Sequence, residues 1–127
     1  MKTLLASLLL VATSGLVSAQ TAASPASLPP DAVTVVIQIV VKPATKPEAV
    51  AAALSDMRNM IKKQPGYLSE EYLENVNPAN SPTKVHVVRW ASSKYWENVF
   101  TTPEFIKLNA AGSKLYTVSA SAFKTAK

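Results

Sequence analysis

The stretch that decides the fold begins with Pro65-Gly66-Tyr67-Leu68-Ser69 and ends with Arg89-Trp90-Ala91-Ser92-Ser93-Lys94-Tyr95-Trp96. Pro-Gly ends a preceding helix, because proline cannot continue a helix and glycine tolerates the turn that follows one. Two strand candidates come next, Tyr67 to Asn75 and Thr83 to Trp90, joined by a loop of turn residues. We expect them to pair as an antiparallel hairpin, after which a serine caps a short aromatic helix.

A buried strand and a long amphipathic helix precede this stretch. From Val33 to Val41 the residues are almost continuously β-branched, which predicts a strand buried on both faces. Thr45-Lys46-Pro47-Glu48 has the pattern of a capping box, so we expect a helix to begin there. Its apolar stripe comprises Ala49, Val50, Ala53, Leu54, Met57, Met60 and Ile61, and the other face carries Asp56, Arg58, Lys62 and Lys63.

The remaining elements complete an α+β fold. Thr101-Thr102-Pro103-Glu104 starts a further helix, Gly112 ends it, and Leu115 to Phe123 forms the last strand. The order β-α-β-β-α-β predicts a ferredoxin-like fold, in which a four-stranded antiparallel sheet carries its helices on one face. Because the first strand is apolar on both sides, we expect a second copy to bury the bare face and form a homodimer.

The first residues predict export. Lys2, the apolar run from Leu4 to Val11, and Val17-Ser18-Ala19 are typical of a secretory signal peptide that is cleaved after Ala19. The apolar run is too short for a stable membrane anchor. We therefore expect a signal peptide over residues 1–19, a flexible lead-in over 20–31 and one folded domain over 32–124, in a periplasmic or secreted protein.

Composition narrows the function classes. The 127 residues include no cysteine, so the chain has neither disulfides nor thiolate ligands. Without Lys2 the formal charge falls from +5 to +4, and the lysines are scattered, unlike the clustered charge of a nucleic-acid-binding protein. The sequence has no glycine-rich phosphate loop and no spacing of His, Asp and Glu that predicts a metal site. With one histidine and no serine in a nucleophile elbow, hydrolase chemistry is also disfavoured.

These motifs resemble the antibiotic biosynthesis monooxygenase (ABM) family of small dimeric α/β-barrel proteins. Pro65-Gly66 closes the first helix and Arg89-Trp90-Ala91-Ser92 ends the third strand, as in that family, and the resemblance covers Val33 to Phe123. Family members are typically cofactor-independent oxygenases of hydroxylated aromatics or quinols, haem-degrading enzymes, or proteins with no established activity. The resemblance therefore implies a dimeric α/β barrel, no cofactor, and a small aromatic or quinol ligand.

The chain departs from the functional residues of both enzymatic branches. At the three haem-degrading positions it offers Val99, Asn109 and either Ile37 or Gln38, so the resemblance disfavours haem degradation. The positions of the polyketide-quinone branch correspond to His86, Trp90, Trp96 and Asn109, and of these only Trp90 is retained.

The residues themselves indicate a pocket. His86, Val88 and Trp90 alternate onto one face of a strand and Trp96 follows, so an imidazole and two indoles can converge, while Arg89 points to the opposite face. Cofactor-free oxygenation needs apolar walls and a base that works near pH 7, and histidine has a reference pKa of ~6.5. The candidate site thus has His86 as catalytic base and no metal, and its substrate-binding residues are Trp90, Trp96, Asn109, Gln38 and Tyr72.

Two functions remain open from the sequence. The first is an exported monooxygenase of a small hydroxylated aromatic or quinol, with His86 as its base. The second is a non-catalytic dimeric module that binds a small ligand or a partner. A lone histidine on an apolar strand is often a hydrogen-bonded structural residue, and tryptophans are often anchors of a core or an interface. Oxygen consumption distinguishes the two.

Overall fold

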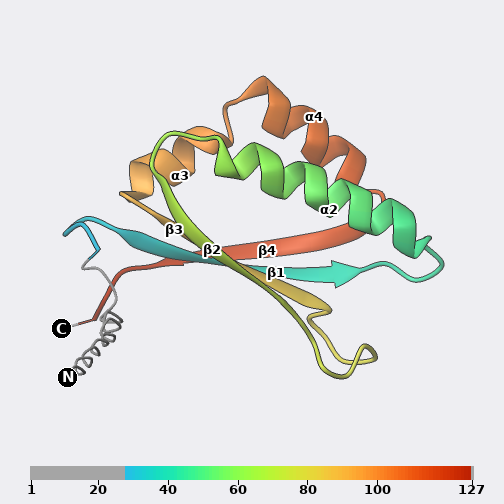
Figure 1. Ribbon diagram of the computed structural model, residues 1–127. Coiled ribbons are helices and arrows are strands. Elements are labelled where there is room, and N and C mark those ends of the chain that lie inside the picture. Colours follow the sequence, from blue (N-terminus) through green and yellow to red (C-terminus); the bar gives the residue numbers. More distant parts are fainter. Residues whose placement is uncertain (1–27, 127) are drawn as a thin grey trace, which may run out of the picture.

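Residues 28–126, the part of the chain that the computed structural model describes, form four strands and three helices (Figure 1). They are β1 (Val33–Val41), α2 (Pro47–Lys62), β2 (Tyr67–Glu74), β3 (Lys84–Trp90), α3 (Ser93–Val99), α4 (Pro103–Gly112) and β4 (Tyr116–Phe123). The expected signal peptide and most of the expected lead-in lie outside the described residues. Within 28–126 there is no helix whose length and apolar character would allow it to cross a membrane.

The strands form one antiparallel sheet in the order β2-β3-β1-β4. In the centre of the sheet, Ile37 of β1 lies opposite His86 of β3 on one side and Ala120 of β4 on the other. At the next strand, Tyr72 of β2 lies opposite His86. All three helices cover the same face of the sheet (Figure 1). This arrangement confirms the predicted ferredoxin-like α+β fold, including the short aromatic helix before the last one.

The start of α2 differs from the predicted capping box. The helix begins at Pro47, so Lys46 occupies the N-cap position, and it makes no side-chain capping hydrogen bond. Thr45 Oγ1 instead donates to the carbonyl oxygen of Lys42 at 2.9 Å. The hydroxyl is used within the tight turn before the helix, where Ala44 has a φ of 65°, and is therefore not available to the first-turn amides.

The core lies between the sheet and α2. Val35 of β1, and Val88 and Trp90 of β3, are completely buried. From α2 the stripe contributes four buried side chains, Val50, Leu54, Met60 and Ile61. Each large apolar side chain that is fully buried contributes about 1.5–3 kcal/mol, so this layer supplies much of the fold's stability.

Gly66 lies in the turn between α2 and β2, where the chain packs against the aromatic helix α3. Its φ is +85°, and a Cβ atom at this position would lie 2.2 Å from Cγ of Tyr95. Only glycine allows both the backbone turn and this close approach of the ring. The Pro-Gly pair therefore ends α2 and also leaves the space into which α3 packs.

The opposite face of the sheet carries no helix. On β1, Val35, Ile37 and Ile39 are buried, whereas the alternate residues Gln38 and Val40 are exposed. Within one chain β1 is therefore buried on one face only, because all the helices pack on that side, and burial of its other face stays a prediction that depends on the expected second copy. The register adds further apolar side chains to the bare face, namely Val36, Val85, Val87 and Leu73.

Candidate functional site

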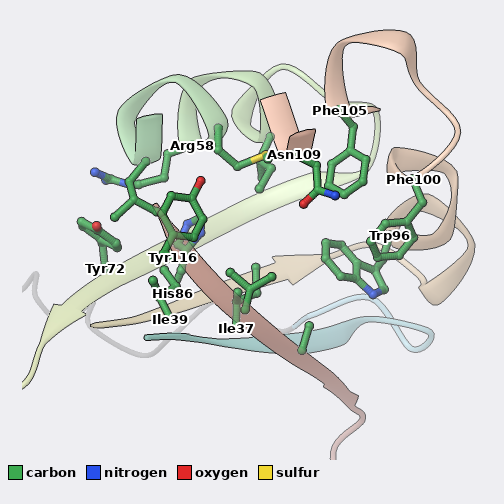
Figure 2. A pocket seen from close by; sticks show the side chains of 15 residues that line it. Ile37, Ile39, Arg58, Tyr72, His86, Trp96, Phe100, Phe105, Asn109 and Tyr116 are labelled. Carbon is green, nitrogen blue, oxygen red and sulfur yellow. The ribbon is translucent and has the colours of Figure 1, made fainter. Parts of the chain in front are cut away.

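A cavity of about 90 Å³ lies between the helices and the sheet (Figure 2). Ile37 and Ile39 of β1 line it from the sheet, and Leu54 and Ile61 of α2 line it from the helix layer. β4 contributes Val118 and Ala120 on the same face as Ile39 and Ile37, their partners in the register. Val118 is 49% exposed, so the cavity opens toward solvent alongside this edge strand.

Aromatic rings form one end of the cavity. Trp96 and Phe100 lie four residues apart and so share a face of the helical segment, with ring centroids 4.6 Å apart. Phe105 meets Phe100 edge-to-face at 5.2 Å, and its backbone N–H donates to Oγ1 of the capping residue Thr102. Edge-to-face aromatic pairs of this kind are individually worth about 0.5–1.5 kcal/mol beyond area burial. The wall is therefore apolar and mutually packed.

Charged and polar side chains form the opposite end, where Figure 2 shows His86, Tyr72 and Arg58 grouped together. A hydrogen bond joins Nε2 of His86 to Oε1 of Glu70, and the imidazole is only 3% exposed. The second oxygen of Glu70 accepts from Nη2 of Arg58 at 3.0 Å and from Nζ of Lys62 at 3.2 Å. The guanidinium of Arg58 lies 4.1 Å from the centroid of the Tyr72 ring, and that ring meets the imidazole edge-to-face. One carboxylate thus links the histidine to two cations.

These contacts set the charges of the site. Burial alone would raise the pKa of Glu70, but the hydrogen bonds from His86, Arg58 and Lys62 outweigh it and lower that pKa to about 2. Burial lowers the pKa of His86, and the hydrogen bond to Glu70 opposes this only in part. Burial also raises the pKa of Tyr72. At neutral pH the site therefore holds a neutral imidazole beside an ionised carboxylate.

Four of the six predicted site residues line the cavity: His86, Tyr72, Trp96 and Asn109. Trp90 does not line it. Its ring is completely buried beneath Trp96, with centroids 5.9 Å apart, so one indole faces the cavity where the sequence predicted two. Gln38 is on the bare face of the sheet, because it alternates with Ile37 and Ile39, which face the cavity. The structure therefore separates Gln38 from the other candidates.

Sequence reasoning missed Glu70 and misplaced Arg58. Glu70 is two residues before Tyr72 on β2, so strand alternation places both on the face that holds His86. Arg58 is four residues after Leu54 and three before Ile61, and this spacing puts it in the apolar stripe rather than on the opposite face. Two features of the sequence could have indicated these residues. The charge of Arg58 falls within the apolar stripe of the helix, and the carboxylate of Glu70 falls on a strand position that faces the helices.

Two cavity-lining residues carry a buried polar atom without a hydrogen-bond partner in the described part of the chain, Nε of Arg58 and Oη of Tyr116. Such groups are uncommon in folded proteins and favour a ligand or water that supplies the missing partner. The same residues, 28–126, contain no cluster of three or more His, Cys, Asp or Glu side chains that could hold a metal ion.

The family model described as antibiotic biosynthesis monooxygenase, ABM, matches residues 32–111, which is more than half of the chain. The chain belongs to the ABM family. The match runs from just before β1 to the end of α4 and confirms the resemblance carried by the Pro-Gly and Arg-Trp-x-Ser motifs. No curated protein matches the sequence significantly.

Solved structures similar to this ABM protein share its fold. SnoaB, a cofactor-independent oxygenase from Streptomyces nogalater, has a TM-score of 0.66 at 18% identity, covering 76% of this chain and 95% of SnoaB. A dimeric protein of unknown function from Bacteroides fragilis has a TM-score of 0.59 at 11% identity, covering 75% and 97% of the two chains. A hydroxynitrile lyase from Passiflora edulis has a TM-score of 0.64 at 14% identity, covering 78% and 99%. The fold therefore carries more than one chemistry.

Proposed function

We propose that this ABM protein is a cofactor-independent monooxygenase of a small hydroxylated aromatic or quinol. The observation that carries the proposal is the cavity itself, in which the buried, neutral His86 lies at one end and the aromatic wall of Trp96, Phe100 and Phe105 at the other. Membership of the ABM family and the fold shared with a cofactor-independent oxygenase support it.

His86 acts as the general base in the proposed reaction. It takes the proton of a phenolic hydroxyl, and the resulting electron-rich phenolate reacts with O2 inside the apolar cavity. One oxygen atom enters the ring, the other leaves as water, and the substrate supplies the electrons as it becomes a quinone. Partial exclusion of water by the aromatic wall favours this path, because competing protonation of the anion is suppressed.

The size of the cavity selects a small substrate. Its 90 Å³ is below the ~150 Å³ of an engineered apolar cavity that holds benzene, so the space accommodates about one ring after a small outward movement of its walls. A larger substrate extends through the opening beside Val118. The unpartnered polar atoms of Arg58 and Tyr116 favour a ligand that carries oxygen atoms.

Oxygen uptake tests the proposal directly. Purified protein, treated with a chelator and free of flavin and haem, is mixed with hydroquinone and with a panel of one- and two-ring phenols in an oxygen electrode. We expect uptake that declines as the pH falls through the pKa of His86, because the imidazolium cannot accept a proton. His86→Ala lowers turnover by roughly a hundredfold, the scale of a lost general base. Absence of uptake across the panel, with retained binding, identifies a non-catalytic binding module instead.

We also propose that the protein is a homodimer formed through the bare face of the sheet. Val36, Val85, Val87 and Leu73 lie on this face, and in a chain with one small core such a surface is most simply covered by a second copy. A dimeric protein of unknown function with the same fold supports the proposal.

Export of the protein is a further proposal, supported by Lys2, the apolar run and the Val17-Ser18-Ala19 cleavage pattern. The mature chain then begins at Gln20. Intact-mass measurement of protein recovered from the periplasm or medium tests this. Recovery of the chain with Met1 in the membrane fraction overturns it.

A further inference from the structure

The single histidine of the chain is held through one ring nitrogen only. Nε2 of His86 is bonded to Oε1 of Glu70, and within residues 28–126 no hydrogen bond reaches Nδ1. A neutral imidazole carries one proton, and its two nitrogens therefore differ: one donates and the other accepts. Which of them is the base depends on the partner of the other.

Glu70 is an acceptor in this arrangement. Its second oxygen already accepts from Arg58 and Lys62, and these hydrogen bonds together with that from His86 keep the carboxylate ionised. An ionised carboxylate has no proton to donate. The hydrogen bond at Oε1 must therefore be donated by His86, which places the imidazole proton on Nε2.

We propose that Glu70 is a positioning residue that locks His86 in the tautomer protonated at Nε2, so that Nδ1 is the atom that accepts a proton from the ligand. The transfer of a ligand proton to Nδ1 rests on the proposed function, whereas the tautomer of His86 is a property of the protein without ligand. When Nδ1 is protonated, the adjacent carboxylate stabilises the imidazolium, as the aspartate does in a Ser-His-Asp triad.

The other titratable and charged groups at this end of the cavity agree with this assignment. Arg58 and Lys62 of α2 bond to Glu70 and not to His86. Burial raises the pKa values of Tyr72 and Tyr116, so both phenols stay uncharged near neutral pH. The two cations thus keep the carboxylate of Glu70 ionised, and the carboxylate orients the imidazole of His86.

Nitrogen-15 NMR of the side chain tests the proposal in the intact protein. Because His86 is the only histidine, its two ring-nitrogen resonances need no assignment against other residues. At neutral pH we expect Nε2 at the shift of a protonated nitrogen and Nδ1 at that of an unprotonated one. The reverse pattern, or an averaged pair typical of two exchanging tautomers, overturns the proposal without any variant.

Glu70→Gln then separates positioning from mere structural support. A glutamine amide can accept from Nε2 or donate to it, so we expect the two nitrogens of His86 to exchange tautomers. Loss of the carboxylate also lowers the pKa of His86 further, because its hydrogen bond and charge raise that pKa. A variant that only loosened the cavity would instead raise the pKa, through hydration of the imidazole.

Glu71→Gln is the matched control. Glu71 is the next residue of the same strand, on the opposite face of the sheet, where its carboxylate is 59% exposed and lies 3.6 Å from Arg89. We expect this variant to leave the nitrogen shifts unchanged. In oxygen uptake, Glu70→Gln should lower kcat at least about tenfold with little effect on KM, since loss of the carboxylate in a Ser-His-Asp triad costs up to ~10⁴-fold through the wrong tautomer.

The two proposals fail in different ways. If the protein shows the Nε2-protonated tautomer but consumes no oxygen, the monooxygenase function is refuted and the positioning role of Glu70 stands. If oxygen is consumed and Glu70→Gln changes neither the tautomer nor kcat, the positioning role is refuted and the monooxygenase function stands.

Discussion

Acid should destabilise this protein chiefly through Glu70 and His86. Glu70 has a pKa of about 2 in the folded chain against 4.5 for the ordinary side chain. Because the folded pKa is the lower one, the carboxylate stabilises the fold above pH 4.5, and this contribution is lost as the pH falls toward 2. At ~1.4 kcal/mol for each tenfold change in proton affinity, the loss is at most about 3 kcal/mol, and solvent screening of the partly exposed Arg58 and Lys62 reduces it.

His86 also makes the folded protein less stable as the pH falls, but its effect begins at a higher pH. Burial lowers the pKa of His86 below 6.5, so the unfolded chain binds its proton before the folded chain does. Stability therefore begins to fall below pH 6.5 because of the histidine and falls further below pH 4.5 because of Glu70.

Urea unfolding followed by far-UV circular dichroism between pH 7 and pH 2.5 measures these losses. In Glu70→Gln the decline below pH 4.5 should be smaller by up to about 3 kcal/mol, whereas Glu71→Gln should decline as the wild type does. Protein concentration is held constant, since dissociation of a dimer also lowers the apparent stability. Equal acid sensitivity in the wild type and Glu70→Gln would refute the reasoning.

Three further predictions concern packing, assembly and the aromatic wall. Gly66→Ala should destabilise the fold by ~2 kcal/mol or more in urea unfolding, because its φ of +85° disfavours alanine and its Cβ meets the Tyr95 ring; an unchanged midpoint would contradict this. Val87→Lys places a charge on the bare face and should convert the sedimenting species from dimer to monomer, so a persistent dimer would exclude this face as the interface. Trp96→Phe should raise KM more than it lowers kcat, because a smaller ring still walls the cavity, and a selective loss of kcat would assign the indole a role in the reaction itself.

His86 can be a hydrogen-bonded core residue and a base at the same time. The sequence left open whether this histidine is a hydrogen-bonded core residue or a base. In the structure it is buried and hydrogen-bonded to Glu70, yet it also lines the cavity. A histidine held at one nitrogen and free at the other meets the requirements of a base, since the bond orients the ring without consuming the accepting atom.

Much of the fold could be predicted from local patterns. The hairpin, the α2 stripe and the end of that helix at Pro65-Gly66 depend on strand alternation, the 3.6-residue period and the backbone preferences of proline and glycine. The predicted capping box at the start of α2 was wrong, also for a local reason. Thr45 had a competing acceptor in the carbonyl of Lys42, and a sequence pattern does not show which hydrogen bond is formed.

The site depended on contacts between elements far apart in the chain. The sequence by itself determined that His86 and Trp90 share a strand face and that Trp96 follows them, because these relations arise within one segment. Only the tertiary structure decided that Trp90 is buried beneath Trp96 and outside the cavity, that Gln38 faces away from it, and that the carboxylate of Glu70 joins His86 to Arg58 and Lys62. The physical reason is that burial and ion pairing are properties of the packed layers. Strand register brings β2 against β3, and α2 packs on the same face, so side chains 8 to 16 residues away from Glu70 meet it only after the chain has folded.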